Sequence, residues 1–564
     1  MHSEFTQVPR IAYFSMEVAL RADIPTYAGG LGILAGDTLR SAADLDLPMV
    51  MVSLVSRRGY FRQELDARGR QLEHPDDWDP SKLAAPLHAK VSVPIAGRSV
   101  WIGGFLYVFE GYRHGRLPVI LLDTDLEENS ADDRRITDVL YGGDAENRLK
   151  QEIVLGIGGV RLLHALGFRI RQYHMNEGHS ALLTLELLRL HAYVEGDVAP
   201  NEPLYDLPRV RRLCSFTTHT PIEAAHDKFP YALVDRVLDD FVERSTLQAE
   251  AGVDALNMTQ LAVNLSEYIN GVAKRHAETS QRMFPGHHVR AVTNGVHPRT
   301  WTCPSFARLY DAHIPDWWIE PELLVRADCC ISPAEIRDAH AEAKQALLQL
   351  VLRTCGVTLD LRLPTIGFAR RMTEYKRPDL LFTDLDRLRR IAQHTPFQLV
   401  LAGKAHPHDD AGKQLIELLH QHMRELAPAI PIVYLPNYDM AIAAALVAGV
   451  DVWLNTPLPP QEASGTSGMK AAFNAVPSLS VLDGWWVEGC VEGVTGWAVG
   501  NGSKLDAGSD AESLYSKLEG LVLPLYYEQP QRWLAVMQGA IAKNAPYFNS
   551  QRMMRRYAAD AYLR

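Results

Sequence analysis

The chain has 564 residues, which is too long for a single hydrophobic core, so two or more domains are expected. Its apolar content of 47% and charged content of 22% are ordinary for a globular protein in water. The net charge of -11 argues against a nucleic-acid partner or an anionic membrane, because both need a basic surface.

The six cysteines lie in no CxxC pair and in no histidine-rich spacing, so we expect no metal site. So few cysteines in so long a chain fit reduced thiols and a cytoplasmic location. The N-terminus shows no basic segment followed by an apolar one, so no secretory signal is expected. The longest uncharged apolar runs, near 47–55 and 440–450, are too short to span a bilayer.

Strand-like apolar runs alternate with helix-like runs through the first half of the chain. Strands are predicted at 48–55 and 119–122. A helix is predicted over 153–166, where apolar residues recur every three or four positions, and another from His179 to Leu188. We place a domain boundary near 294–305, where Pro298 and Pro304 interrupt the pattern. This gives domains of 1–300 and 301–564.

The second half follows the same alternation more clearly. A strand at 365–368 is followed by a loop rich in arginine and lysine, and Pro378 is predicted in the first turn of the next helix. Strands at 398–402, 431–434 and 450–454 then alternate with helices at 411–426 and 440–448. The pattern predicts an α/β fold with doubly wound parallel sheets, whose ligands bind at the carboxyl ends of the strands.

Residues 462–470 read Glu-Ala-Ser-Gly-Thr-Ser-Gly-Met-Lys and are the most informative stretch. The small residues let backbone N–H groups face an oxygen or phosphate at a helix start. Glu462 supplies a carboxylate for hydroxyl groups. Lys470, about two turns into the segment, is placed to form a Schiff base with an aldehyde cofactor. The residues alone equally allow a Gly/Ser-rich loop with a solvated lysine.

This stretch resembles the pyridoxal-phosphate lysine motif of the α-glucan phosphorylases, the family of glycogen, starch and maltodextrin phosphorylases. Other segments resemble the same family in the same order, from about residue 13 to residue 490. They are 28–32 (AGGLG), 176–179 (NEGH), 218–220 (THT), 293–295 (TNG), 369–377 (ARRMTEYKR) and 437–438 (NY). Taken together these motifs are highly specific, and the chain is closest to the short bacterial form.

The resemblance implies two Rossmann-like domains facing across a cleft, the GT-B arrangement, with the last helix, near 551–563, packing back on the first domain. It implies a glycosyltransferase of glycogen catabolism that cleaves α-1,4-glucan with phosphate to give glucose 1-phosphate, with retention. The cofactor would be pyridoxal 5′-phosphate, whose 5′-phosphate exchanges a proton with the substrate phosphate. The partners would be the glucan and inorganic phosphate, and the resemblance suggests a homodimer.

The motif matches carry over to individual residues. Matches to catalytic positions are Lys470, Arg371, Lys376, His219 and Glu462. Matches around the cofactor are Lys470, Gly29, Gly30, Arg370, Thr466, Ser467, Tyr438 and Trp301. Matches around the sugar are Gly30, Leu31, His219, Asn294, Glu462, Ala463, Ser464 and Gly465. Taken singly, the arginine–lysine pair reads as solvated surface charge, His219 as a core histidine, and the aromatic residues as core packing.

Three positions depart from the long enzymes of the family. Asp439 stands where those enzymes usually have arginine, Gly468 where they have asparagine, and Ala28 where they have asparagine. The loop that gates their site has no clear equivalent, and 129–136 occupies that region.

Two other readings remain open from the residues. The first is a nucleotide-sugar-dependent glucan synthase on the same scaffold. Such enzymes often carry a second carboxylate eight residues after the first to bind the ribose, and this chain has Lys470 there. The second is an inactive glucan-binding protein, against which the intact Lys470, Arg371 and Lys376 speak.

Overall fold

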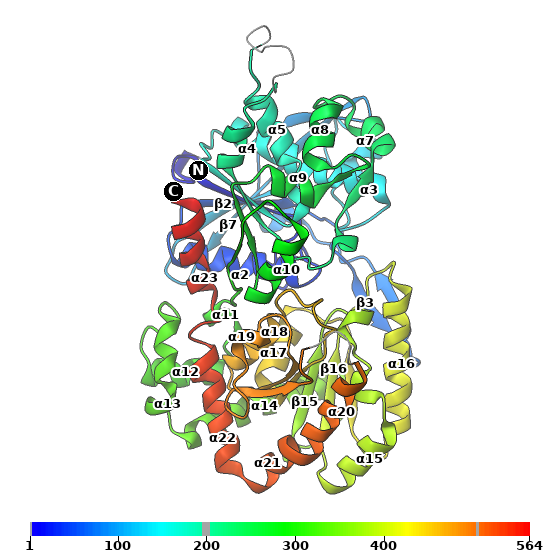
Figure 1. The fold of residues 1–564 in the computed structure, drawn as a ribbon, viewed down its shortest axis with the longest axis vertical. Helices are drawn as coiled ribbons and strands as arrows, with labels where there is room; N and C mark the ends of the chain where they lie inside the picture. Colours follow the sequence, from blue (N-terminus) through cyan, green and yellow to red (C-terminus); the bar gives the residue numbers. More distant parts are fainter. Residues whose placement is uncertain (1–2, 195–203, 503–506, 564) are drawn as a thin grey trace.

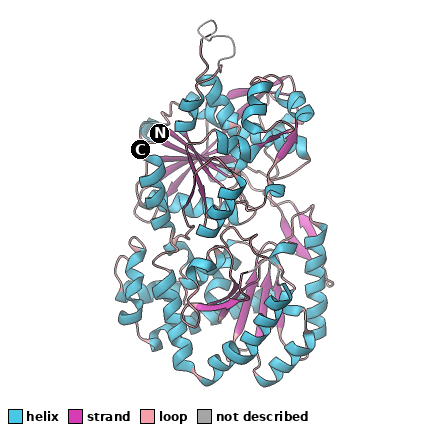
Figure 2. Cartoon of the chain, viewed as in Figure 1, coloured by secondary structure: helices cyan, strands magenta, loops and turns pink. Residues whose placement is uncertain are grey.

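The computed structural model describes residues 3–194, 204–502 and 507–563. It contains two α/β units, one above the other in Figure 1. Each is built around its own twisted sheet with helices on both faces (Figure 2). One hydrophobic cluster runs from Phe5 to Val289 and another from Val296 to Phe548, so each sheet has its own core. The predicted α/β fold class is confirmed.

The N-terminal sheet is largely parallel, with an antiparallel edge. Its order is β14-β13-β10-β9-β1-β2-β8-β7-β5, and β6 pairs with β7. β1 pairs with β2 and β9 in parallel, whereas β7 runs antiparallel to β8. The chain winds outward from β1 in one direction and then from β9 in the other, so the topological switch point lies between β1 and β9. The strands are β1 Ile11–Ser15, β2 Met49–Leu54, β5 Ala85–Pro86, β6 Val91–Ile95, β7 Arg98–Glu110, β8 Arg116–Asp123, β9 Gln172–Asn176, β10 Cys214–Thr217, β13 Tyr268–Gly271 and β14 Val289–Ala291.

The C-terminal sheet is parallel throughout. Its order is β17-β16-β15-β18-β19-β20, so the switch point lies between β15 and β18. All five residues of β15 and of β16 are buried, as expected for strands covered by helices on both faces. The strands are β15 Thr365–Ala369, β16 Gln398–Ala402, β17 Ile432–Leu435, β18 Val452–Asn455, β19 Ser478–Val481 and β20 Gly496–Val499.

Helices cover both sheets. Those of the N-terminal half are α1 Ser3–Gln7, α2 Gly30–Asp44, α3 Ala145–Ile153, α4 Gly159–Ala165, α5 Leu183–Leu190, α6 Leu207–Leu213, α7 Tyr231–Leu238, α8 Arg244–Ala251, α9 Met258–Asn264, α10 Lys274–Met283 and α11 Pro298–Trp301. Those that follow are α12 Pro304–His313, α13 Ala327–Cys330, α14 Pro333–Cys355, α15 Leu385–His394, α16 Asp410–Leu426, α17 Met440–Gly449, α18 Ser467–Ala472, α19 Trp486–Gly489, α20 Ala507–Lys517, α21 Leu523–Glu528, α22 Pro530–Gly539 and α23 Ser550–Tyr557.

Two predicted helix starts are wrong. Pro378 lies in a turn before the short 3-10 segment Leu380–Phe382, and α15 begins only at Leu385, where Asp384 caps it by accepting from the Arg387 N–H. The segment near His179 forms a 3-10 turn, Gly178–Ser180, and α5 begins at Leu183. In both places a short 3-10 turn separates the loop at the end of the strand from the helix that follows.

The end of the chain packs on the N-terminal sheet. α23, red in Figure 1, lies beside α2, and Met553, Met554 and Tyr557 are buried there. The Tyr557 hydroxyl lies 3.1 Å from Thr217 Oγ1 and accepts from Asn270 Nδ2 at 2.9 Å. Residues far apart in sequence therefore complete one core.

In the described part of the chain, no helix is both long and apolar enough to cross a membrane. The six cysteines are unpaired thiols: Cys214, Cys303, Cys329, Cys330, Cys355 and Cys490.

Candidate active site

A cavity of about 990 Å³ lies where the carboxyl ends of the two sheets face each other. The loops after β1 and β9, at the N-terminal switch point, supply Glu17 and Glu177. The loop after β15, at the C-terminal switch point, supplies Arg370 and Arg371. Both sheets thus place their ligand-binding edges on one cleft, as doubly wound sheets do.

Lys470 lies in the wall of this cavity with only 6% of its surface exposed. It is the fourth residue of α18, so it lies one turn into the helix, and the predicted two turns are wrong. Its Nζ is 3.5 Å from the ring centroid of Trp301. Burial lowers the pKa of Lys470 to about 8. Within the described residues it forms no ion pair with a carboxylate, so its amine is unusually ready to lose its proton.

The loop after β15 carries three cations. Two of them, Arg370 and Lys376, contact the carboxylate of Glu462, and the third, Arg371, lines the cavity. Glu462 Oε2 accepts from Lys376 Nζ at 2.6 Å and pairs with the Arg370 guanidinium, which also contacts Asn455. Arg371 is exposed on the cavity side and forms no carboxylate ion pair among the described residues. The loop therefore keeps one arginine free for an anion while Glu462 balances the other two cations.

Glu462 is held ionised by these neighbours. Burial alone would raise the pKa of this carboxyl, but Arg370 and Lys376 outweigh that effect and bring the pKa down to about 2. In this arrangement Glu462 contacts protein cations, whereas the sequence led us to expect it on sugar hydroxyls. Its contact with a sugar stays a prediction.

The glycine-rich loop begins α2 at the edge of the cavity. Glu17 Oε2 accepts from the backbone N–H groups of Ala28 at 2.6 Å and Gly29 at 3.0 Å. The Gly29 N–H is thus taken by a side chain of the protein, which differs from its expected place on a phosphate. A Cβ at Gly29 or Gly30 would meet nothing within 4 Å, so this face of the loop is open to a ligand. Gly30 and Leu31, the first residues of α2, line the cavity here, so a helix N-terminus borders that space.

His219 is neutral and fixed in one tautomer. Its Nε2 is 2.7 Å from Asn176 Oδ1, and because an amide oxygen only accepts, His219 must donate from Nε2. Burial lowers the pKa of His219 to about 3, so Nδ1 remains an acceptor. Glu177 Oε2 accepts from the His219 backbone N–H at 2.7 Å and so fixes the loop that carries the ring.

Three buried side-chain polar atoms around the cavity have no hydrogen-bond partner among the described residues. They are His179 Nδ1, Asn294 Oδ1 and Ser464 Oγ, each on a residue that lines the cavity. A buried polar group without a partner is costly, so these atoms mark places for a polar ligand. Hydroxyl groups would satisfy all three.

The structure brings nearly all of the predicted site residues to this one cavity. The lining includes Gly29, Gly30, Leu31, His219, Asn294, Arg370, Arg371, Lys376, Tyr438, Glu462, Ala463, Ser464, Gly465, Thr466, Ser467 and Lys470. Trp301 is not part of the lining. It lies behind Lys470, and its Nε1 donates to Asp37 of α2.

Two departures from the long enzymes have local explanations. Asp439 caps α17 by accepting from the Ile442 N–H at 2.8 Å, so its carboxylate serves the helix start. A Cβ at Gly468 would approach Trp485 Cζ2 to 2.6 Å, so the ring of Trp485 leaves room only for glycine. Ala28 lies beside Glu17 as described above.

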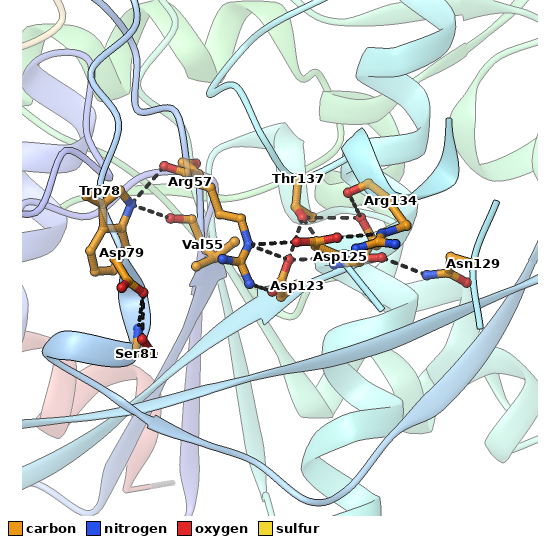
Figure 3. A network of polar contacts seen from close by, with 12 residues as sticks. Val55, Arg57, Trp78, Asp79, Ser81, Asp123, Asp125, Asn129, Arg134 and Thr137 are labelled. Atoms are coloured by element: carbon orange, nitrogen blue, oxygen red, sulfur yellow. Dashed lines mark hydrogen bonds and ion pairs between the residues drawn. The ribbon is translucent and has the colours of Figure 1, made fainter. Parts of the chain in front are cut away.

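Residues 129–136, which occupy the region of the gating loop of the long enzymes, lie away from the cavity. Figure 3 shows Asn129 and Arg134 in a polar network with Asp123 and Asp125 at the end of β8, and Arg134 Nε donates to Asp125 Oδ1 at 2.6 Å. None of these residues lines the cavity. Residues 141–145, which include Gly142 and Gly143, line it instead.

Sequence reasoning also missed several lining residues. They include Tyr60, Tyr141, Arg148, Asp227, Lys404 and His406. Lys404 follows β16 by two residues, so the rule that parallel strands present ligands at their carboxyl ends could have found it. Arg148 donates to Glu152 at 2.9 Å and Asp227 at 3.1 Å. That pairing joins a helix to a distant loop, and no local signal marks it.

Among the described residues, no group of three or more histidine, cysteine, aspartate or glutamate side chains could hold a metal ion. The arrangement suits anion binding by Arg371, hydroxyl recognition by neutral polar groups, and covalent chemistry at the Lys470 amine.

Comparison with known proteins adds independent evidence. A family model described as carbohydrate phosphorylase matches residues 239–495. The maltodextrin phosphorylase of Thermococcus litoralis is 39% identical, covering 98% of this chain and 70% of the relative. The glycogen phosphorylase of Aquifex aeolicus is 35% identical, covering 100% and 87%. An uncharacterised protein of Methanocaldococcus jannaschii is 31% identical and covers 98% and 99%, so it matches this chain along nearly all of both lengths.

Proposed function

The chain belongs to the carbohydrate phosphorylase family, and on that premise we propose that it catalyses reversible phosphorolysis of α-1,4-glucan. The products are α-glucose 1-phosphate and a glucan shortened by one residue, with the anomeric configuration retained. The reaction needs a phosphate held against the anomeric carbon, a proton for the leaving oxygen, and stabilisation of an oxocarbenium-like transition state.

Lys470 is the observation that carries this proposal. It is a buried lysine without a carboxylate partner among the described residues, its pKa is lowered to about 8, and it shares one cavity with Arg371 and Lys376. A lysine kept in a buried position without a counter-ion is costly. The cost is explained if the amine carries an aldehyde cofactor, because a covalently attached amine no longer has to bear a buried ammonium charge.

The residues around Lys470 fit pyridoxal 5′-phosphate. Lys470 would carry it, the open face at Gly29 and Gly30 would border it, and Arg370 and Tyr438 would lie near it. Thr466 and Ser467, just before and at the start of α18, would complete its surroundings. When bound, the cofactor supplies a phosphate group that can give and take a proton.

The chain's own residues hold the two substrates. Arg371 would bind the substrate phosphate through paired N–H groups, and Lys376 would add a compact positive charge. His219 would accept from a sugar hydroxyl at Nδ1, and Asn294 Oδ1 and Ser464 Oγ would each gain a hydroxyl partner. When both substrates are bound, these contacts would keep water away from the reacting bond. Transfer to phosphate is then favoured over hydrolysis.

The glucan synthase alternative fits less well. Such enzymes often carry a carboxylate for the ribose eight residues after the first, and this chain has the buried Lys470 at that position, packed against Trp301. The homodimer and the cytoplasmic location stay predictions.

An absorption spectrum of the purified protein tests the proposal. A cofactor band that borohydride fixes onto the peptide containing Lys470, together with phosphate-dependent release of glucose 1-phosphate from maltodextrin, is expected. A protein without that band, which transfers glucose only from a nucleotide sugar, would be a glucan synthase instead. A protein with neither band nor transfer would be a glucan-binding protein.

A further inference from the structure

A β-hairpin of the N-terminal half reaches across to the C-terminal half. It consists of β3 Arg62–Leu65 and β4 Gln71–His74, paired antiparallel, and we call it the strap. In Figure 1 it lies beside α16, at the side of the molecule away from α11 and α23. Most of its side chains are exposed or partly exposed, but Gln63 and Gln71 are 3% and 4% exposed. Two buried amides in an otherwise exposed hairpin call for an explanation.

The Gln63 residue is bonded to two loops of the C-terminal half. Its Nε2 donates to Gly403 O at 2.9 Å, and its Oε1 accepts from the Asn437 N–H at 2.8 Å. Its backbone N–H donates to Asn437 Oδ1 at 2.9 Å, so Gln63 and Asn437 exchange a pair of bonds. Asn437 has a positive φ of 55°, a strained backbone conformation that these bonds hold.

Gln71 binds the first of these loops a second time. Its Nε2 donates to Ala405 O and its Oε1 accepts from the Ala405 N–H, both at 3.0 Å. It also accepts from Gln63 Nε2 at 2.8 Å, so the two amides form one connected unit. Each amide oxygen and nitrogen in the pair has a partner, which is the condition for a buried polar network to specify one arrangement.

The two loops gripped by the strap line the candidate active site. Gly403 packs so closely on the loop after β15 that a Cβ there would lie 2.0 Å from Arg370 O. The Met372 N–H donates to Lys404 O at 2.9 Å, which joins the same two loops through their backbones. Tyr438, directly after Asn437, lines the cavity. The amide pair is thus one residue from the cavity wall on each loop.

The tip of the strap contacts α16 apart from the amides. A Cβ at Gly69 would approach the His420 ring to 2.3 Å, and Arg424 Nη1 donates to Ala67 O at 3.4 Å. Within β4, Glu73 Oε1 accepts from Gln71 Nε2 and lies 2.9 Å from Lys413 Nζ of α16, so that contact belongs to the amide network. We therefore expect the tip to stay docked when the glutamine contacts are lost, which separates positioning by the amides from docking by the tip.

We propose that Gln63 and Gln71 are positioning residues for phosphate binding, acting on Arg370 and Arg371 through the loops at 403–405 and 437–438. This inference rests on the proposed phosphorolysis. The strap belongs to the glucan-side half, so it makes the geometry of the phosphate-side loops depend on how the two halves are set against each other. Neither glutamine touches the reacting groups.

The test compares Gln63→Met and Gln71→Met, which keep the length of the side chain but lose the amide, with the control Glu64→Ala. Glu64 lies on the exposed face of the same hairpin. Each methionine variant should raise the KM for phosphate by about tenfold, because one or two hydrogen bonds that order the loop are lost. The KM for maltodextrin should change less than about twofold. Glu64→Ala should change neither.

The variant Gln63→Glu tests the donor half of the amide. It keeps an acceptor for the Asn437 N–H but turns a buried carboxylate oxygen toward two acceptors, Gly403 O and Gln71 Oε1, so its phosphate KM should rise at least as much as that of Gln63→Met. Equal changes in both KM values, or a glutamate variant with the wild-type phosphate KM, would overturn the proposal.

Hydrogen exchange on the same proteins supplies a readout that does not need turnover. The peptides covering 403–406 and 437–439 should exchange faster in the methionine variants, while α16 should stay protected. Unchanged exchange at both loops would also overturn the proposal. If the wild type shows no phosphorolysis, the proposed function fails, and the exchange result still decides whether the strap orders these loops.

Discussion

The Nζ of Lys470 lies 3.5 Å from the ring centroid of Trp301, and the Trp301 indole is held by Asp37 of the opposite half through bonds of 3.0 and 2.9 Å. The aromatic face gives the ammonium a weak attraction without offering it a proton acceptor. The amine is therefore kept near the cavity, poorly solvated and easily deprotonated.

Replacing Lys470 by alanine should remove the bound chromophore and nearly all activity. The reason is that each of the other described lysines lining the cavity has an acceptor: Lys376 has Glu462, Lys404 has Phe61 O and Lys228 has Glu223. Lys404, which also lines the cavity, is the matched control, and Lys404→Ala should keep a borohydride-fixable band at wild-type stoichiometry. Spectra of both variants after gel filtration make the measurement. A stoichiometric fixable band in Lys470→Ala would mean that another residue is the anchor.

Lys470 should also lower the stability of the cofactor-free protein near neutral pH. Its pKa is about 8 in the folded state against 10.5 for the ordinary side chain. Between these values the unfolded chain binds a proton that the folded protein has released, so the free energy of unfolding should rise from pH 8 to 10.5.

Lys470→Met should reduce that rise and stabilise the cofactor-free protein by roughly 3 kcal/mol at pH 7. Part of the rise should remain, because burial also lowers the pKa of Lys404 to about 8. Urea unfolding across this pH range measures both effects. A variant with the same pH slope as the wild type would place the titration elsewhere.

Arg371→Ala should act chiefly on phosphate. Because Arg371 has no carboxylate partner among the described residues, its removal leaves no buried charge unpaired, and stability should change little. The loss of one charge-assisted contact should cost roughly 2–4 kcal/mol of transition-state stabilisation, seen mainly in the KM for phosphate. Arg353→Ala, on the exposed end of α14, is the control. Equal effects on phosphate and glucan would show that Arg371 shapes the cleft generally.

Glu462→Gln should destabilise the fold, unlike Arg371→Ala. It leaves Arg370 and Lys376 as two buried cations without a counter-charge, which should cost roughly 3–5 kcal/mol of unfolding free energy at pH 7. The pKa of Glu462 is lowered from 4.5 to about 2, so its contribution is complete above pH 4.5 and is lost as the pH falls toward 2. The variant should lack this acid-limb loss in denaturant titrations. An unchanged acid limb would contradict the pairing.

Asn294→Ala should weaken sugar binding without weakening the fold. Asn294 Oδ1 has no partner among the described residues, so removing it also removes a buried unsatisfied acceptor. We expect a raised KM for glucose 1-phosphate in the synthetic direction and a melting temperature at or above the wild-type value. A lower melting temperature with unchanged kinetics would assign Asn294 a structural role.

The fold could be predicted because its strands are buried on both faces and stand out as apolar runs, as in 398–402, which is also the observed β16. Lys470 and Arg371 could be predicted because each lies in a local motif at a strand end. The pairing of Arg370 with Glu462 could not, since which cation meets which carboxylate depends on how two distant loops approach each other. The same holds for Gln63 and Gln71, whose partners lie in the other half of the molecule.

The position of α23 has a consequence for the order in which the protein can be made. Thr217 of β10 and Asn270 of β13 both contact the hydroxyl of Tyr557, near the other end of the chain. A growing chain exposes the sheet face under α23 until residues 553–557 have emerged, because Met553 and Met554 cover it. The half synthesised first is therefore the half finished last, and stalled translation products should offer chaperones and proteases that uncovered apolar face.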